Sequence, residues 1–181
     1  MCILDSETIW SIKMNSSSIW DKRYLKMAEL VASWSKDPKA HVGAVIVRDN
    51  RVVATGFNGF PSGVLDDDRL QDQETKLAMT VHAEVNALVS AGDRAQGATI
   101  YVWGKPVCSR CASSIIQAGL MRVVEIRAST QTTKPSKWDQ SGELAKKMFS
   151  EAGIQCHQIS LAEAAANDES EASIQESSVR S

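Results

Sequence analysis

The feature that most constrains this chain of 181 residues is a His-x-Glu triplet, His82-Ala83-Glu84, followed by a Cys-x-x-Cys pair at Cys108 and Cys111. One imidazole and two thiolates suit Zn²⁺, and a set of three ligands leaves its fourth position open, as in catalytic zinc sites. Glu84 has the wrong spacing to be a fourth ligand from the same helical turn, but it stands beside the metal. The chain must therefore fold so that these two segments meet.

The position of both segments at predicted helix starts strengthens the zinc interpretation. Cys108 and Cys111 lie at the start of a predicted helix, where the helix N-terminus favours thiolate over thiol. His82 also opens a predicted helix. Either motif alone is weak evidence, whereas the two together indicate a catalytic zinc with Glu84 as its proton carrier, and hence a zinc hydrolase of the deaminase kind.

Two other interpretations of the cysteines stay open. A thioredoxin-like redox pair belongs after the first strand of its fold, and it leaves the His-x-Glu triplet unexplained. A closed structural zinc needs a fourth ligand. The spare candidates for that ligand are Cys2, His41, Cys156 and His157.

Composition excludes several classes of protein. A net charge of −2 gives no overall attraction to nucleic acid, so no polynucleotide partner is expected. No apolar run approaches the roughly 18 residues of a membrane span, so no membrane is expected. The N-terminus has no basic region of a secretory signal, and we expect a cytoplasmic protein with reduced cysteines.

Hydrophobic periodicity predicts a mixed α/β fold in one domain, residues 18–160. An N-terminal helix is predicted at 18–35, with a core-facing stripe of Trp20, Tyr24, Met27, Ala28, Val31 and Trp34. The five predicted strands are 42–47, 51–55, 99–103, 123–126 and 154–159, and the later helices are 81–91, 108–119 and 142–153. This alternation implies helices on both faces of a mixed five-stranded sheet.

The two ends of the chain are predicted to lie outside this domain. Residues 1–17 are expected to be a flexible leader, with a short docking segment as the alternative. Residues 161–181 are rich in Ala, Glu and Ser and are expected to be disordered, with a short helix at 162–166 as the alternative.

An acidic run, Asp66-Asp67-Asp68, precedes the His82 helix. Three adjacent carboxylates are able to hold the Mg²⁺ of a nucleotide effector. The alternative is a solvated helix start or lid.

Several segments together resemble deoxycytidylate (dCMP) deaminases over about residues 19–159. They are Val42–Val47, the loop T-G-F-N-G-F-P-S-G at 55–63, H-A-E-V-N-A at 82–87 and I-I-Q-A-G at 115–119. The resemblance implies a cytidine-deaminase-like three-layer α/β/α sandwich and hydrolysis of dCMP to dUMP and ammonia. The G-F-N-G-x-P loop is its most discriminating part.

The resemblance also implies roles for individual residues. His82, Cys108 and Cys111 match the zinc ligands, and Glu84 matches the general acid/base. Asn58 is expected to contact the nucleotide sugar, the Ala83 backbone N–H the base carbonyl, and Trp138 the region of the substrate. The candidates for phosphate contacts are Lys39, His41, Arg110 and Lys134.

Two positions depart from the family pattern. Val107 stands between Pro106 and Cys108, where the family usually has Pro directly before the first Cys, so the loop near the base is expected to differ in shape. His41 occupies a position where a basic residue is common, and it is either a pH-dependent phosphate contact or a partly exposed loop residue.

The resemblance further suggests a homo-oligomer, a hexamer or dimer, under allosteric control by dCTP and dTTP. Ser62 and Gly63 lie in the loop expected to respond to such an effector. The other hypotheses are dCTP as the substrate, a tRNA or free-base deaminase with the same zinc site, and an inactive zinc-scaffold subunit. A slightly acidic chain disfavours tRNA, and the intact Glu84 disfavours the scaffold.

Overall fold

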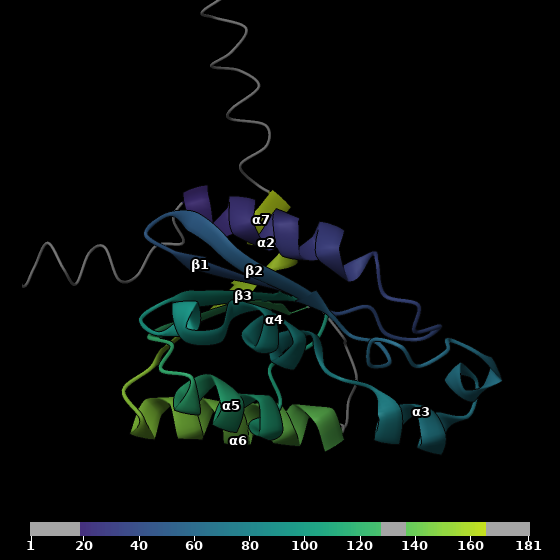
Figure 1. Ribbon diagram of the computed structural model, residues 1–181. Helices are drawn as coiled ribbons and strands as arrows, with labels where there is room; N and C mark the ends of the chain where they lie inside the picture. Colours follow the sequence, from purple (N-terminus) through teal and green to yellow (C-terminus); the bar gives the residue numbers. More distant parts are fainter. Residues whose placement is uncertain (1–18, 128–136, 166–181) are drawn as a thin grey trace, which may run out of the picture.

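A computed structural model describes residues 19–127 and 137–165, and its centre is a five-stranded sheet (Figure 1). The strands lie in the order β2-β1-β3-β4-β5. Their bounds are β1 Gly43–Arg48, β2 Arg51–Phe57, β3 Thr99–Trp103, β4 Arg122–Arg127 and β5 Gln155–Ser160. Strand β1 pairs antiparallel with β2 and β3, whereas β3, β4 and β5 are parallel. The prediction of a mixed five-stranded sheet is confirmed.

The β1–β2 hairpin closes through two residues that both have positive φ, Asp49 at 51° and Asn50 at 59°. Two such residues in a row are typical of the two-residue turn whose twist matches that of the paired strands. The hairpin makes β2 the edge strand, and its last residue leads directly into the loop at Asn58.

Helices cover both faces of the sheet, which confirms the three-layer α/β/α sandwich (Figure 1). One face carries α2 (Ile19–Ala32) and the short α7 (Leu161–Ala165). The other face carries α4 (Ala83–Ala91), α5 (Ser109–Gln117) and α6 (Lys137–Glu151). The short helix α3 (Gln73–Met79) lies beyond one end of the sheet, and the remaining turns are η1 (Asp68–Leu70) and η2 (Gly92–Ala95).

The sheet separates two hydrophobic cores, because successive strand residues point to opposite faces. Val45 and Tyr101 pack on the α2 side with Leu25 and Val31. Ile46 and Ile100 pack on the other side, with Ile115 of α5 among their neighbours. The second core holds α4 and α5 side by side, and these are the helices that carry the metal-ligand motifs.

The apolar stripe predicted for the first helix is only half correct. Tyr24, Ala28 and Val31 are buried, but the side chains of Trp20, Met27 and Trp34 are exposed by 44%, 39% and 51%. Hydrophobicity alone cannot tell a core face from an outer apolar face. Leu25 and Ala32 are buried in their place.

Three other boundaries differ from the predictions. Helix α6 begins at Lys137 rather than Gly142, and α3 was not predicted as a helix of its own. Residues 161–165 form α7 rather than a disordered segment, which favours the short-helix alternative there. The leader at 1–17 and the rest of the C-terminal tail lie outside the described residues. No helix in the described ranges has the length and apolarity to cross a bilayer.

Candidate active site

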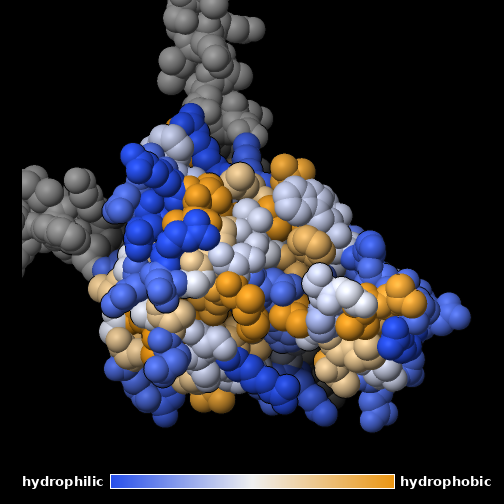
Figure 2. Space-filling model, viewed as in Figure 1, coloured by the Kyte–Doolittle hydropathy of each residue, from blue (hydrophilic) through white to orange (hydrophobic). Residues whose placement is uncertain are grey.

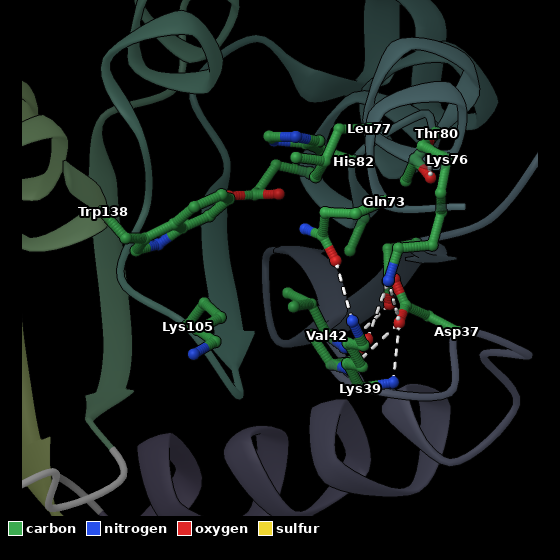
Figure 3. A pocket seen from close by; sticks show the side chains of 14 residues that line it. Asp37, Lys39, Val42, Gln73, Lys76, Leu77, Thr80, His82, Lys105 and Trp138 are labelled. Atoms are coloured by element: carbon green, nitrogen blue, oxygen red, sulfur yellow. Dashed lines mark hydrogen bonds and ion pairs between the residues drawn. The ribbon is translucent and has the colours of Figure 1, made fainter. Parts of the chain in front are cut away.

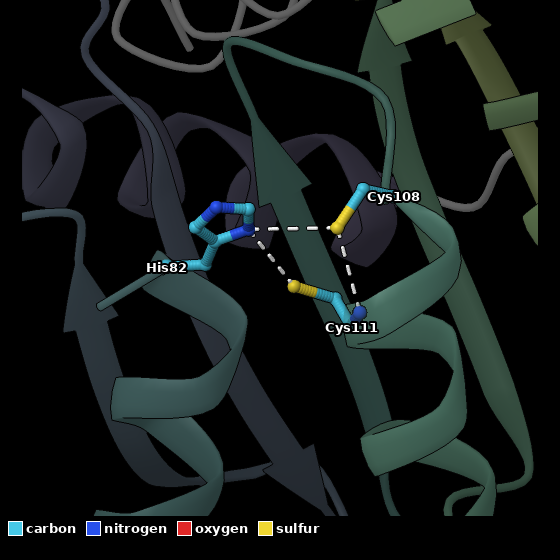
Figure 4. A group of neighbouring side chains, drawn as sticks. All are labelled: His82, Cys108 and Cys111. Atoms are coloured by element: carbon cyan, nitrogen blue, oxygen red, sulfur yellow. Dashed lines mark hydrogen bonds between the residues drawn. The ribbon is translucent and has the colours of Figure 1, made fainter. Parts of the chain in front are cut away.

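The N-termini of α4 and α5 bring the two ligand motifs together (Figure 4). His82 is the residue before α4, and it follows Val81, which pairs with Gly59 in an isolated bridge. Cys108 caps α5, and its sulfur accepts a hydrogen bond from the Cys111 backbone N–H at 3.4 Å. The folded chain therefore places one imidazole and two sulfurs at adjoining helix starts.

The distances within this cluster fit one tetrahedral metal. His82 Nδ1 lies 3.2 Å from Cys111 Sγ and 3.5 Å from Cys108 Sγ. All three ligand atoms lie within 4.8 Å of one another. Zinc bonds of about 2.0 Å to nitrogen and 2.3 Å to sulfur separate tetrahedral N and S ligands by roughly 3.5 Å. The residues present therefore fit Zn²⁺, in both donor chemistry and spacing.

The electrostatics of the cluster favour a metal-binding form of Cys108. A hydrogen bond from the Cys111 thiol is the largest cause that lowers the pKa of Cys108, to about 4, and His82 adds to it. The thiolate is the form of cysteine that ligates metals. Glu84 is 2% exposed, and this burial is the main cause that raises its pKa, to about 7.

The close approach of α4 to the sheet depends on Gly56. A Cβ atom at Gly56 would lie 2.4 Å from the Ala83 carbonyl oxygen and 2.4 Å from the Ala87 nitrogen. Only a residue without a side chain lets β2 and α4 pack this tightly. Because Ala83 begins α4 between His82 and Glu84, this contact sets the position of both functional side chains.

A cavity of about 180 Å³ opens next to the cluster (Figure 3). Its wall includes His82, which precedes α4, Ala83 and Glu84 from α4, and Trp138 from α6. The other lining residues are Asp37, Lys39, Ala40, Val42, Asn58, Gln73, Lys76, Leu77, Thr80 and Lys105. The cavity therefore adjoins the cluster at His82 and has Glu84 in its wall, and concave sites of this kind are where small molecules bind.

Asn58 lines the cavity but uses its side chain to hold the adjacent loop. Its Oδ1 accepts a hydrogen bond from the Val42 backbone N–H at 2.8 Å, and its Nδ2 donates to the Ala40 carbonyl at 2.9 Å. Ser35 Oγ donates to the Asn58 carbonyl at 2.8 Å. One N–H of the amide is left for a ligand, since an amide nitrogen has two.

Trp138 lies at the cavity wall beside the metal ligands. Its ring centroid is 5.5 Å from that of His82, and its Nε1 donates to the Pro106 carbonyl at 2.9 Å.

Val107, the departure from the family pattern, is 2% exposed, and its backbone N–H donates to Glu125 Oε2 at 2.8 Å. The altered loop is therefore well anchored, and the Cys-x-x-Cys turn after it is intact.

Four other predicted site residues do not line the cavity. His41, Arg110, Ser62 and Gly63 are exposed, and none of them is among its lining residues. Of the further phosphate candidates, Lys39 lines the cavity and Lys134 lies outside the described residues. Asn58, Ala83 and Trp138 line the cavity together with Glu84 and with His82 of the cluster.

The acidic run at 66–68 does not form a carboxylate cluster. Asp66 pairs with Lys36 at 2.6 Å, and Asp67 caps η1 and binds Arg69 at 2.7 Å. Across the described ranges, the single group suited to a metal is His82, Cys108 and Cys111. The structure therefore gives no support to the predicted Mg²⁺ site.

Several cavity residues were missed by the sequence-based reasoning. Asp37 and Lys76 form a buried ion pair at 2.8 Å, and Gln73 Oε1 accepts a hydrogen bond at 3.1 Å from Lys39, which was a predicted candidate. Lys105 comes from the loop between β3 and α5. No local sequence pattern marks Asp37, Gln73, Lys76 or Lys105 as residues of a site.

Comparison with known proteins places the site in a family. Residues 18–126 match the cytidine and deoxycytidylate deaminase zinc-binding region. A deaminase encoded in the luxG 3′ region of Aliivibrio fischeri, of uncharacterised function, is 44% identical over 139 residues, which are 76% of this chain and 92% of that protein. Human deoxycytidylate deaminase is 34% identical over 145 residues, 75% of this chain and 76% of that protein.

A solved structure shares the fold. The dCMP deaminase of cyanophage S-TIM5, crystallised in complex with dCMP and dUMP, aligns with a TM-score of 0.61 at 22% identity. The alignment covers 80% of this chain and 100% of that one. The fold and site define a zinc deaminase, and the chain belongs to the cytidine and deoxycytidylate deaminase family.

Proposed function

We propose that this protein hydrolyses dCMP to dUMP and ammonia. The observation that carries the proposal is the His82, Cys108 and Cys111 cluster at a cavity whose wall contains the buried Glu84. Relatives named deoxycytidylate deaminase, from human and from Saccharomyces cerevisiae at 36% identity, support the choice of dCMP.

Glu84 is the residue to which the proposal assigns proton transfer. Zn²⁺ in such a three-ligand site lowers the pKa of water in its fourth position to about 7. Glu84 takes a proton from the water that attacks C4 of the cytosine ring and passes it to N3. The same carboxyl then helps to protonate the departing ammonia. Its burial keeps bulk water from competing for these protons.

The substrate is proposed to lie with its base between α4 and Trp138. The Ala83 backbone N–H at the start of α4 meets the base carbonyl, since the first N–H groups of a helix have no partner within it. The Trp138 ring supplies an apolar wall beside His82. The remaining amide N–H of Asn58 donates a hydrogen bond to the sugar, while its contacts with Val42 and Ala40 hold the loop in place.

A substrate panel tests this proposal. Zinc-replete protein is incubated with dCMP, dCTP, deoxycytidine and cytosine, and the loss of cytosine absorbance is followed. Preferred turnover of dCMP supports the proposal. Preference for dCTP or for the free base would identify that compound as the substrate in place of dCMP. Absence of turnover with zinc bound would support a polynucleotide substrate or a scaffold role.

We also propose that the protein forms a homo-oligomer, a hexamer or dimer, in the cytoplasm. Exposed apolar side chains lie on α2 and the turn after it, on the β2 edge and on α4: Leu30 at 59%, Trp34 at 51%, Phe57 at 37% and Val89 at 77%. Figure 2 shows apolar surface on the side where the edge of the sheet meets these helices. Sedimentation of the purified protein tests this, and a monomer contradicts it.

Control by dCTP and dTTP remains part of the proposal. The exposed loop with Ser62 and Gly63 is the expected place of response, and Gly63 has a φ of 85° that a bulkier residue rarely adopts. Titrating dCTP and dTTP into the dCMP assay tests the effector role. Rates that do not change with either nucleotide contradict it.

A further inference from the structure

Three lysines line the cavity, and two of them already have partners in the folded chain. Lys76 is 3% exposed and pairs with Asp37 at 2.8 Å, so its charge is neutralised. Lys39 is exposed, and its Nζ donates to Gln73 Oε1 at 3.1 Å. Both interactions fix α3 and the loop after α2 at one side of the cavity (Figure 3).

Lys105 differs from both. Within residues 19–127 and 137–165 its side chain makes no ion pair and no hydrogen bond, although it is half-buried. Figure 3 shows Lys105 beside Trp138, on the opposite side of the cavity from Asp37 and Lys76. A half-buried ammonium that has no partner among the described residues is a place where an anion would be stabilised.

The backbone on both sides of Lys105 is held in place. Gly104 has a φ of 103°, and a Cβ there would lie 2.1 Å from the His41 carbonyl oxygen. The turn at Gly104 therefore packs directly on the backbone that leads into β1. On the other side, the Pro106 carbonyl accepts the Trp138 Nε1 hydrogen bond at 2.9 Å, and the Val107 N–H donates to Glu125 at 2.8 Å. Lys105 thus extends from a fixed loop into the cavity.

We propose that Lys105 binds the 5′-phosphate of the substrate and so makes the enzyme select a nucleotide over a nucleoside. The inference rests on the proposed function, because it assumes that the cytosine base lies at Glu84. With the base between α4 and Trp138, the inference places the 5′-phosphate farther along the cavity wall, where Figure 3 shows Lys105 next to Trp138. Lysine is a common phosphate ligand, acting as a point charge.

The test compares Lys105→Gln with Lys105→Arg, which keeps the charge, and with Lys147→Gln, which removes an exposed charge from the outer side of α6. Hydrogen bonds to charged groups contribute about 1.5–3 kcal/mol, so K105Q is expected to lower kcat/KM for dCMP by roughly 10- to 100-fold. Deoxycytidine turnover is expected to change less than about threefold, since it carries no phosphate. K105R retains most of the selectivity, and K147Q retains all of it.

A binding measurement separates this inference from the proposed function. Calorimetry with dUMP and deoxyuridine reports phosphate recognition without turnover, and zinc content and circular dichroism verify the fold of each variant. If K105Q binds dUMP more weakly than the wild type but binds deoxyuridine equally well, the inference is supported, even if the wild-type protein deaminates a different substrate. An equal effect on dUMP and deoxyuridine, or no effect, overturns it.

Two further arms make the assignment specific. Lys39→Gln is measured alongside, and a selective loss of dUMP binding in K39Q with none in K105Q transfers the role to Lys39 and overturns the inference. A loss in K105Q confined to dCTP places Lys105 at an outer phosphate and overturns its assignment to the monophosphate.

Discussion

Lys76 Nζ lies 2.8 Å from Asp37 Oδ1, and the two side chains are only 3% and 9% exposed. The pair joins α3 to the loop that follows α2, at the wall of the active-site cavity. Asp37 Oδ1 also accepts hydrogen bonds from the backbone N–H groups of Lys39 and Ala40, at 2.8 and 3.1 Å. This carboxylate is therefore the point at which the two segments are held together.

Removal of Lys76 is expected to destabilise the protein strongly. Lys76→Met leaves the Asp37 carboxylate buried without its cation, and breaking a buried pair in this way costs about 3–5 kcal/mol. The matched control is Lys36→Met, because the Lys36–Asp66 pair is exposed and such pairs contribute about 0–1 kcal/mol. Urea unfolding measures both variants, and equal losses would contradict the role of the buried pair.

The same pair predicts a pH dependence. Burial alone raises the pKa of Asp37, but hydrogen bonds from Lys76 and from the Lys39 and Ala40 backbone outweigh it and lower the pKa. A carboxyl whose pKa is lower in the folded protein contributes stability above its unfolded value of about 3.9, and the contribution is lost as the pH falls through the folded value.

We therefore expect wild-type protein to lose more unfolding free energy than Asp37→Asn between about pH 5 and pH 3. Other carboxyls titrate in this range in both proteins, so the difference between the two curves isolates Asp37. Parallel curves would show that Asp37 has the same pKa in the folded and unfolded chain.

Gly56 provides a test of how α4 is positioned. Gly56→Ala places a methyl group 2.4 Å from the backbone of α4, and such overpacking costs about 1–3 kcal/mol. Because α4 begins next to His82, zinc affinity should fall together with stability. Gly59→Ala is the control, since its nearest neighbour is the Phe57 side chain at 3.9 Å. A G56A protein with wild-type stability and zinc affinity refutes the contact argument.

Much of this fold was predictable because the signals are local. Strand β3 was predicted with its observed bounds, and the meeting of His82, Cys108 and Cys111 in a group able to hold a metal followed from two short motifs at helix starts. Long-range contacts were not predictable in this way. Asp21 lies in the first turn of α2, and it accepts hydrogen bonds from Tyr101 and Arg122, which are 80 and 101 residues away.

The cavity shows the same limit. Lys76 and Asp37 are separated by 39 residues, and only the folded chain reveals that they meet beside the motif. Lys105 lies in the loop where Val107 departs from the family pattern, and the sequence shows the departure without showing which side chain the loop presents. His41 was chosen because a basic residue is common at its position in the family, and Arg110 was a further candidate for a phosphate contact, but both residues are exposed and neither lines the cavity.

The most direct test of the central claim is dCMP turnover by zinc-replete wild-type protein and Glu84→Gln side by side, with zinc content measured on the same samples. General acid–base catalysis contributes about 10²–10⁴-fold, so E84Q should lose at least 100-fold in kcat while it binds zinc like the wild type. Glu143→Gln, an exposed change on α6, should keep full activity. Near-normal turnover by E84Q, or no turnover by the zinc-loaded wild type, would contradict the account.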